Sequence, residues 1–377
     1  MKISLLNNLY APYNRGGAEK VVERLKSDLE ILGHQVFVIT TTPEDFKIDE
    51  ANRIYYLPSN YYYLNSWPAT LRFLWQLGNL FSFQKEAEIN RILQAEKPDL
   101  IIGHNLMGLG FLTPQLIKKL KISYVQILHD IQLLHPSGLM NYGQEKIINT
   151  LPAKVYQLIT RYLFKSPALI VSPSRWLLDL YTQKGFFKNS KKIVLRNPQP
   201  KDTSNQTSGA PTNDYFKFLY VGQIETYKGI LFLLETFKSI ENERIKLIII
   251  GDGSQMEKAK AITQDDHRFE FLGAKDSAGV QVAMNSCQAL IMPSLVYENS
   301  PNVILEASHC NLPVLASNLG GIPELIQEFG GLLFTPNSIT DLKTKMEEII
   351  SNYSNYKNKA FIDDKVTDYG QEIINNL

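Results

Sequence analysis

The sequence has only two cysteines, Cys287 and Cys310, among its 377 residues, and their spacing fits neither a metal site nor a disulfide framework. Both lie in apolar sequence, so we expect buried, reduced thiols and a cytoplasmic protein. No apolar run approaches the length of a membrane-spanning helix. The first apolar run, residues 3–6, is too short for a secretory signal and is expected to form a strand. These absences exclude a disulfide-rich secreted scaffold.

The chain also lacks a large net charge, which is +1, but its two halves differ in sign. Residues 1–197 contain 24 Lys and Arg against 15 Asp and Glu, whereas residues 198–377 contain 15 against 23. The basic half suits an anionic membrane or a phosphate-bearing acceptor, which predicts peripheral contact with the inner face of the membrane. The alternative is that the imbalance only maintains solubility. We expect no nucleic-acid partner.

Short apolar runs alternate with helical patterns in both halves, which predicts parallel sheets with helices on both faces. In the first half, strands are expected at 3–6, 36–40, 100–102, 124–128 and 169–171, with a helix at 18–32. In the second half, strands are expected at 218–221, 247–250, 269–272, 289–292, 313–316 and 331–334, and helices at 230–239, 255–262, 278–285, 301–309, 322–328 and 339–351.

The fold class that follows is α/β, with two doubly wound, Rossmann-like domains. The predicted division is 1–198, a linker at 199–214 that is rich in Pro, Ser, Thr, Asn and Gly, and 215–351. Residues 352–377 are predicted to form a helical tail that packs back on the first domain. Because ligands of such sheets bind at the carboxyl ends of the strands, the two domains are expected to face each other across a binding cleft.

The most informative segment runs from Met292 to Glu306 and holds two carboxylates, Glu298 and Glu306, eight positions apart. Between them, Ser300 is a suitable N-cap and Pro301 suits the first position of a helix. Glu298 is therefore expected in the loop, with Glu306 in the second turn. The N–H groups of Asn302 and Val303 would then form a site for phosphate. A phosphate site between two hydroxyl-binding carboxylates indicates a nucleotide-sugar.

Glycine pairs and a lysine add weaker signals at the expected strand ends. Gly16 and Gly17 precede the first helix, where backbone can approach an anion closely, although a plain turn is the alternative. Lys228 occupies the matching position in the second half and could hold a leaving diphosphate, or be a solvated loop lysine. Gly251-Asp252-Gly253 fits a tight turn as well as a ligand contact.

Three further side chains could face a ligand. His129 follows the predicted strand at 124–128 and could bind a sugar hydroxyl, although a lone histidine is more often structural. His104 has a similar position with less support. Glu324, after Gly320-Gly321, fits simple compensation of a helix dipole, while those glycines could let a loop close over a base or diphosphate.

Taken in order, these motifs resemble family 4 glycosyltransferases, the group 1 glycosyl transferases of GT-B architecture, over nearly the whole chain. The specific element is Glu-x7-Glu between Pro293-Ser294 and Leu305-Glu306-Ala307. The other matching pieces are Gly16-Gly17, Gly33–Val36, Asp99–Ile102 with His104, Leu128–Asp130, Tyr220–Gly222 with Lys228-Gly229, Gly251–Gly253, Phe271–Gly273, Pro313-Val314 and Gly320–Glu324.

The resemblance implies metal-independent transfer of a sugar, with retention at the anomeric carbon, from a UDP- or GDP-sugar to a glycan, lipid-linked or other hydroxyl acceptor. No cofactor is implied, and the sequence lacks an obvious Asp-x-Asp metal loop. The resemblance implies these roles: Glu298 at the donor sugar, His129 beside the transferred sugar, and Lys228 at the diphosphate. The implied donor-binding residues are Gly17, Gln223, Gly251, Gly273, Asn299, Ser300, Asn302, Val303 and Glu306.

One position departs from the family pattern. Gln223 stands where the family usually has arginine, and glutamine supplies neither a charge nor a guanidinium fork. The departure keeps open a non-catalytic nucleotide-sugar binder, such as a partner subunit. A GT-B epimerase needs more acid and base residues than the sequence offers, and a phosphorylase usually needs a pyridoxal lysine that nothing here marks.

An aromatic cluster and a helical pattern occupy the basic half. The cluster comprises Tyr55, Tyr56, Tyr61, Tyr62, Tyr63 and Trp67, and residues 71–93 then place apolar side chains at helical spacing. Amphipathic aromatic residues suit a membrane interface or an acceptor surface. The favoured alternative is a packed helical insertion.

Overall fold

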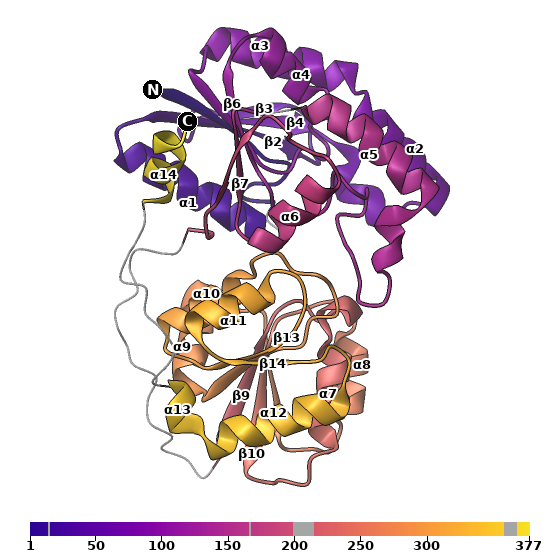
Figure 1. Ribbon diagram of the computed structural model, residues 1–377, viewed down its shortest axis with the longest axis vertical. Coiled ribbons are helices and arrows are strands. Elements are labelled where there is room, and N and C mark those ends of the chain that lie inside the picture. Colours follow the sequence, from indigo (N-terminus) through magenta and orange to yellow (C-terminus); the bar gives the residue numbers. More distant parts are fainter. Residues whose placement is uncertain (14–15, 166, 199–214, 358–367) are drawn as a thin grey trace. The chain divides into compact units, whose positions relative to one another are not determined.

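The computed structural model describes residues 1–377 except 14–15, 166, 199–214 and 358–367. The predicted linker at 199–214 therefore lies outside the described residues, as does the middle of the predicted tail. The chain forms two compact units (Figure 1). Unit 1 holds the first 139 residues, 146–198 and the C-terminal helix, whereas unit 2 holds Met140–Glu145 and most of the second half. The segment Met140–Glu145 thus departs from the predicted division at 198.

Unit 1 contains an eight-stranded sheet in the order β3-β4-β2-β1-β5-β6-β7-β8. All pairs are parallel except β3 with β4. The strands are β1 (Lys2–Leu6), β2 (Gln35–Thr42), β3 (Lys47–Asp49), β4 (Ile54–Pro58), β5 (Leu100–Gly103), β6 (Ser123–Ile127), β7 (Leu169–Ser172) and β8 (Lys191–Val194). The expected parallel sheet is confirmed, but β3, β4 and β8 were not predicted, because they are short and rich in polar or aromatic residues.

Helices of unit 1 follow the predicted alternation. They are α1 (Gly17–Ile31), α2 (Ala69–Leu80), α3 (Phe83–Glu96), α4 (Thr113–Lys119), α5 (Leu151–Phe164), α6 (Arg175–Gln183) and α14 (Tyr369–Asn375), with 3-10 turns η1 (Asn60–Ser66) and η2 (Glu145–Asn149). Gly33 has a φ of +83°, as expected for the residue that ends α1. Tyr369 and Ile373 of α14 join the core formed by α1 and the central strands.

The aromatic cluster divides between two environments. Tyr55 and Tyr56 belong to strand β4, which was not predicted. Residues 71–93 fall in two helices, α2 and α3. Helix α3 buries Ile89, Ile92 and Leu93, as a packed insertion would. In α2, by contrast, the apolar side chains of Leu71, Phe73, Leu74 and Leu77 are exposed, so packing does not explain them.

Unit 2 contains a six-stranded, fully parallel sheet in the order β11-β10-β9-β12-β13-β14. The strands are β9 (Phe216–Val221), β10 (Ile245–Ile250), β11 (Phe269–Gly273), β12 (Ala289–Met292), β13 (Val314–Ser317) and β14 (Leu332–Phe334). The helices are α7 (Ile230–Lys238), α8 (Met256–Ile262), α9 (Ser277–Ser286), α10 (Asn302–His309), α11 (Ile322–Phe329), α12 (Ile339–Ser351) and α13 (Tyr353–Lys357), with the 3-10 turn η3 (Thr226–Lys228).

Alternating side chains of the unit 2 strands enter two separate cores, because successive residues of a strand point to opposite faces. Phe218 and Tyr220 of β9 join the core that α7 and α12 cover. Leu219, between them, joins the core that α10 and α11 cover. Figure 1 shows these helix pairs on opposite faces of the sheet. The expected doubly wound domain is therefore confirmed, and both cysteines are buried, free thiols.

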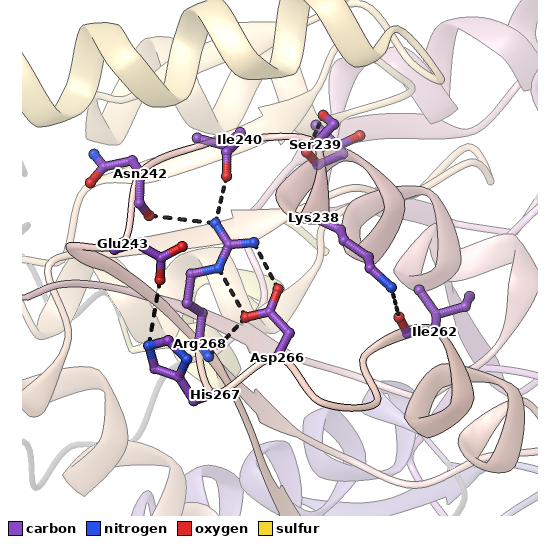
Figure 2. Close-up of polar contacts among 10 residues, drawn as sticks. Lys238, Ser239, Ile240, Asn242, Glu243, Ile262, Asp266, His267 and Arg268 are labelled. Carbon is purple, nitrogen blue, oxygen red and sulfur yellow. Dashed lines mark hydrogen bonds and ion pairs between the residues drawn. The ribbon is translucent and has the colours of Figure 1, made fainter.

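Arg268 fastens the amino-terminal edge of this sheet (Figure 2). Its guanidinium donates to both carboxylate oxygens of Asp266, at 2.9 and 2.7 Å, and to the Ile240 carbonyl at 2.5 Å. The hydrogen bonds of Arg268 hold the pKa of the Asp266 carboxyl below its ordinary value. The cluster ties the turn after α7 to the start of β11, at the end of the strands opposite to the loops described next.

Candidate active site

The strand order places the candidate site of unit 2 between β9 and β12. These strands are neighbours, and the chain crosses from β9 toward β10 on one side and from β12 toward β13 on the other. Ligands of doubly wound sheets bind at the carboxyl edge of such a switch point. The loop after β9 carries Gly222 to Lys228, and the loop after β12 carries Pro293 to Glu298. The two predicted segments therefore meet at this edge.

Lys228 and Glu298 form an ion pair there, with 2.6 Å between Lys228 Nζ and Glu298 Oε1. Ser294 Oγ donates to the same carboxylate oxygen over 3.2 Å. Burial alone would lower the pKa of Lys228, but the charge and hydrogen bond of Glu298 raise it above its ordinary value. The lysine is therefore a permanent cation at physiological pH. The structure thus brings together two predicted site residues, and adds Ser294 as a third polar contact.

The glycines around this pair allow two backbone segments to pack closely against each other. Gly320 has a φ of +62°, and a Cβ there would lie 2.2 Å from the Glu298 carbonyl oxygen. Gly321 N–H donates to that same carbonyl over 2.9 Å. A Cβ at Gly229, with a φ of +75°, would lie 1.8 Å from the Pro293 carbonyl oxygen. Only glycine fits at these positions, and each contact fixes the loop that carries Glu298 or Lys228.

The Gly251–Gly253 turn packs in the same manner. A Cβ at Gly251 would lie 1.8 Å from the Gly222 carbonyl oxygen, and one at Gly253 would lie 2.5 Å from that of Ile224. Ile224 N–H donates to Asp252 O over 2.8 Å, and Gly251 N–H donates to Gly273 O over 3.0 Å. The turn therefore supports the loop after β9, which accounts for its glycines without a ligand.

Gln223 is exposed, and its side-chain oxygen accepts a hydrogen bond from Tyr227 Oη over 2.7 Å. Tyr220 Oη donates to the Gln223 carbonyl over the same distance. Tyr227 also approaches Lys228, whose Nζ lies 5.8 Å from the centre of its ring. No role was predicted for Tyr220 or Tyr227, although Tyr220 belongs to the matching Tyr220–Gly222 motif and Tyr227 directly precedes Lys228.

Helix α10 begins one residue later than predicted. Asn302 is its first residue, and Pro301 precedes it with a φ of −68° and a ψ of +121°. The prediction that Ser300 is the N-cap and Pro301 the first helical residue is therefore wrong. Proline fixes φ but leaves ψ free, so the same residue also suits the extended cap position. Glu306 lies in the second turn as expected, and the first two helical N–H groups belong to Asn302 and Val303.

Other predicted donor-binding residues line the same region of unit 2. Asn299 and Ser300 are buried, each with 8% of its surface exposed. Val303 packs on the core beneath α10 and α11. Glu306 is partly buried beside Cys310, and its charge adds to burial in raising the pKa of that thiol to about 11. Glu324 falls in the first turn of α11.

The loop that precedes Glu298 is paired with Met140–Glu145, a segment from the first half of the sequence. Asn141 and Val296 form an antiparallel bridge, and Tyr297 N–H donates to the Met140 carbonyl over 2.9 Å. Tyr297 Oη donates to Glu145 Oε1 over 3.0 Å. This segment was not predicted, because no sequence signal joins residues about 150 positions apart.

In unit 1, the structure joins His129 to His104. The His104 Nδ1 to His129 Nε2 distance is 2.8 Å, and the rings stack with 5.1 Å between their centres. Burial lowers the pKa of His129 to about 4, and that of His104 well below its ordinary value. Both imidazoles are therefore neutral at pH 7, which suits hydrogen bonding to hydroxyl groups. His104, which had less support from the sequence, is the direct partner of His129.

Asp130 completes this cluster at the carboxyl ends of β5 and β6. Its carboxylate accepts from Gln132 N–H over 2.7 Å and from Asn105 Nδ2 over 3.3 Å. Burial raises the pKa of Asp130 to about 6, although the Gln132 hydrogen bond opposes the shift. At the neighbouring strand β1, the first helix begins at Gly17 with Gly16 as its extended N-cap. Gly17 is thus the first helical residue, so the helix starts one position earlier than predicted.

Within the described residues, no group of three or more His, Cys, Asp and Glu side chains is arranged to hold a metal ion. None of the described helices combines the length and the apolar character needed to cross a bilayer.

Comparisons with known proteins agree with the geometry. The model of the glycosyl transferase 4-like domain matches residues 16–198, and that of glycosyl transferases group 1 matches residues 201–363. A Klebsiella pneumoniae protein described as an uncharacterized 42.6 kDa protein in the cps region is 27% identical over 344 residues, covering 89% of this chain and 90% of that one. N-acetyl-alpha-D-glucosaminyl L-malate synthase of Bacillus anthracis is 24% identical, covering 83% and 78%.

Solved structures show the same fold. Anabaena Alr3699/HepE in complex with UDP has a TM-score of 0.72 and 18% identity, covering 100% of this chain and 99% of that one. The lipopolysaccharide outer core galactosyltransferase WaaB in its apo form has a TM-score of 0.69 and 18% identity, with full coverage of both chains. Together the two family models span nearly all of the chain. The chain therefore belongs to the family 4, group 1 glycosyltransferases and has their GT-B architecture of two parallel-sheet α/β domains.

Proposed function

We propose that this glycosyltransferase takes its sugar from a nucleotide-diphosphate donor that binds at the carboxyl edge of the unit 2 sheet. The observation that carries the proposal is the Lys228–Glu298 ion pair at the β9–β12 switch point. A diphosphate can take the place of the Glu298 carboxylate as the anionic partner of Lys228. The carboxylate is then released to accept hydrogen bonds from the hydroxyls of the sugar. A single exchange of partners thereby allows Lys228 to bind the diphosphate and Glu298 to bind the sugar of the same donor.

The remaining roles follow the family resemblance. Glu306, in the second turn of α10, binds the ribose hydroxyls, and the backbone around Asn299, Ser300, Asn302 and Val303 serves the diphosphate or the sugar. Lys228 stabilises the charge that grows on the departing diphosphate, so that no metal ion is needed for this step. His129, neutral and paired with His104, binds a hydroxyl of the transferred sugar. The departing phosphate oxygen accepts the proton of the acceptor on the same face, which gives retention.

The donor and acceptor classes are proposed from the relatives. The solved complexes of Alr3699/HepE with UDP and with UDP-glucose make UDP-sugars the first donors to test, with GDP-sugars as the second choice. The relative in a cps region and the lipopolysaccharide transferases favour a glycan or lipid-linked acceptor in polysaccharide biosynthesis. Such an acceptor would place the protein in the cytoplasm, with peripheral contact at the inner face of the membrane.

A second candidate is a nucleotide-sugar binder without catalytic activity. It is favoured by Gln223, which stands where the family usually has arginine and whose oxygen is held by Tyr227. Loss of one charged hydrogen bond to the diphosphate corresponds to about 1.5–3 kcal/mol. Lys228 and the start of α10 remain as counter-charges, so we favour the enzyme.

A donor panel separates the two candidates. The purified chain is incubated with UDP-, GDP- and ADP-sugars, and thermal shift and release of the nucleoside diphosphate are both measured. An enzyme should release UDP or GDP slowly from one donor, and Glu298→Gln should strongly lower the release while thermal stabilisation by the nucleotide persists. Stabilisation without any release, with candidate acceptors present, identifies the binder. Repeating the active reaction with EDTA tests metal independence, and NMR of the anomeric proton in the product tests retention.

A further inference from the structure

Helix α5 (Leu151–Phe164) presents a row of apolar side chains that unit 1 does not cover. Leu151, Val155, Leu158 and Tyr162 follow one another at steps of four, three and four residues, so they share one face of the helix. Their exposed fractions are 76%, 49%, 56% and 66%. The opposite face is buried, through Tyr156, Leu163, Phe164 and others. The outward row therefore does not serve the core of unit 1.

A cationic pocket adjoins the C-terminal end of this row. Its volume is about 520 Å³, and its lining contains four cations and no carboxylate. Two of the cations, Arg161 and Lys165, come from the last turn of α5 and the residue that ends it. Lys165 Nζ lies 5.0 Å from the centre of the Tyr162 ring, so the pocket and the apolar row are continuous. The complete lining is Lys118, Arg161, Lys165, Gly185, Phe187, Lys188 and Asn189.

Other elements are held against the pocket by hydrogen bonds. Gln115 of α4 donates from Nε2 to the carbonyls of Leu163 and Tyr162, at 2.5 and 2.9 Å, which fixes the helix that carries Lys118. Arg161 Nη1 donates to the Lys184 carbonyl over 3.1 Å and so fixes the loop that carries Lys188. These hydrogen bonds fix the elements that carry the cations, while the side chains of Lys118, Lys165 and Lys188 are exposed to solvent.

The charge of the surrounding sequence agrees with an anionic partner. Residues 146–192 contain nine Lys and Arg and one acidic residue, Asp179. Helix α4 adds Lys118 and Lys119 in its last turn. An excess of this size produces a positive field that extends over about a Debye length in physiological salt.

We infer that α5 docks on a phospholipid bilayer that carries anionic headgroups. The row Leu151, Val155, Leu158 and Tyr162 enters the boundary between headgroups and acyl chains, and lipid phosphates occupy the pocket formed by Lys118, Arg161, Lys165 and Lys188. An outward apolar row flanked by cations is the pattern of a helix that lies in the membrane interface. The inference deepens the proposed function, because a membrane surface is where a lipid-linked acceptor resides.

The charge also argues against two other occupants. A second copy of this chain, docked through the same face, would bring two cationic pockets together, and like charges across an interface are repulsive. A nucleic acid would use the cations but would leave the apolar row without a partner. Only a surface that is both anionic and apolar can contact the apolar row of α5 and the adjoining cations together.

Co-sedimentation with vesicles tests the inference on the full chain without donor. Vesicles of phosphatidylcholine alone are compared with vesicles that also contain phosphatidylglycerol, at low and at physiological salt. We expect binding that requires phosphatidylglycerol. Leu158→Glu should lower the partition coefficient by about tenfold or more, since a buried leucine side chain is lost. Lys165→Gln and Lys188→Gln should each lower it by about fivefold, as expected for one cation near an anionic surface.

Matched control variants lie on unit 2. Val282 is 70% exposed on α9, and Lys258 is exposed on α8, so Val282→Glu and Lys258→Gln make the same changes elsewhere and should leave binding intact. Equal binding to both vesicle types, or loss in Leu74→Glu of α2 but not in Leu158→Glu, would overturn the inference. So would a dimer in solution that Leu158→Glu dissociates without any effect on vesicles.

The result is independent of the proposed donor site. Release of UDP or GDP from a soluble donor should be the same in wild type, Leu158→Glu and Lys165→Gln. Failure of vesicle binding with donor turnover intact rejects only the docking surface. Vesicle binding without donor turnover rejects only the proposed function.

Discussion

Lys228 and Glu298 neutralise each other at 2.6 Å although 70 positions separate them in the sequence. Each residue is held by backbone packing, because Gly229 lies against Pro293 and Gly320 lies against Glu298. The pair therefore occupies a fixed place at the edge of the unit 2 sheet. Under the proposed function, the donor diphosphate and its sugar separate the two charges when they bind.

Substitution of Lys228 and substitution of Glu298 should have different effects on the affinity for the nucleotide. Lys228→Met should weaken the affinity for UDP or GDP by ten- to a hundredfold, the value of a charged hydrogen bond of about 1.5–3 kcal/mol. Glu298→Gln removes the competitor of the diphosphate, so nucleotide affinity should stay the same or increase while turnover falls by about a hundredfold. Isothermal titration with the nucleotide and a release assay check the two effects. Glu257→Gln, on the exposed side of α8, is the control and should change neither.

Gly320→Ala should disable the site without a change of any polar group. The new Cβ would lie 2.2 Å from the Glu298 carbonyl, in a residue whose φ of +62° already disfavours a side chain. The loop that carries Glu298 must therefore move, and turnover should fall by at least tenfold, because small displacements of a catalytic group are costly. Gly78→Ala is the control. Gly78 lies in α2 with no atom within 4 Å of a Cβ, so that change should preserve turnover and stabilise the helix by about 0.5–1 kcal/mol.

The stability of unit 1 should depend on pH through two opposing groups. Asp130, with a pKa raised to about 6, keeps its proton in the folded state at pH values where the unfolded carboxyl has lost it, so its contribution falls as pH rises from 4 to 6. His129, lowered from 6.5 to about 4, binds its proton only in the unfolded state over that range, so its contribution rises with pH. His104 acts in the same direction as His129.

Substitution of Asp130 or His129 should leave the pH dependence of stability that the other residue causes. Asp130→Asn should make the free energy of unfolding increase more steeply between pH 4 and 6, by a difference on the order of 2 kcal/mol across the window, and His129→Gln should flatten the dependence. Denaturant titrations followed by tryptophan fluorescence measure this, because Trp67, Trp75 and Trp176 all belong to unit 1. Identical slopes in wild type and both variants would contradict the assigned shifts.

Arg268→Ala should destabilise unit 2 by about 3 kcal/mol, because Asp266 and the Ile240 carbonyl lose a buried charged partner. Arg268→Lys should recover only part of this, since lysine cannot donate to both carboxylate oxygens. The control is the neighbouring His267–Glu243 pair, whose side chains are 69% and 71% exposed and 3.5 Å apart. Glu243→Gln should change stability by less than about 0.5 kcal/mol. Circular dichroism reports both units and tryptophan fluorescence reports unit 1, so an earlier circular-dichroism transition with an unchanged tryptophan transition would show that the effect is confined to unit 2.

The elements that the sequence predicted well are those with strong local signals. The central strands are near-continuous aliphatic runs, because parallel strands are buried on both faces. Both ends of α12 were predicted correctly, because its apolar residues recur at a clear helical period. Strands β3 and β8 were not predicted, since edge strands need no apolar run, and the interior strand β4 was not predicted because it is short and contains two tyrosines. The cap of α10 was displaced by one residue, because proline is compatible with both positions.

For the site, the sequence alone was enough to place Glu298 before a helix, Glu306 within it, and Lys228 after a strand. Local residue preferences and the Glu-x7-Glu spacing decide those positions. Only the tertiary structure decided which groups meet. The strand order brings the β9 and β12 loops to one edge, so that Lys228 reaches Glu298, Ser294 joins them and His104 stacks on His129. Such contacts join residues far apart along the chain, and they depend on strand pairing and packing that no local pattern encodes.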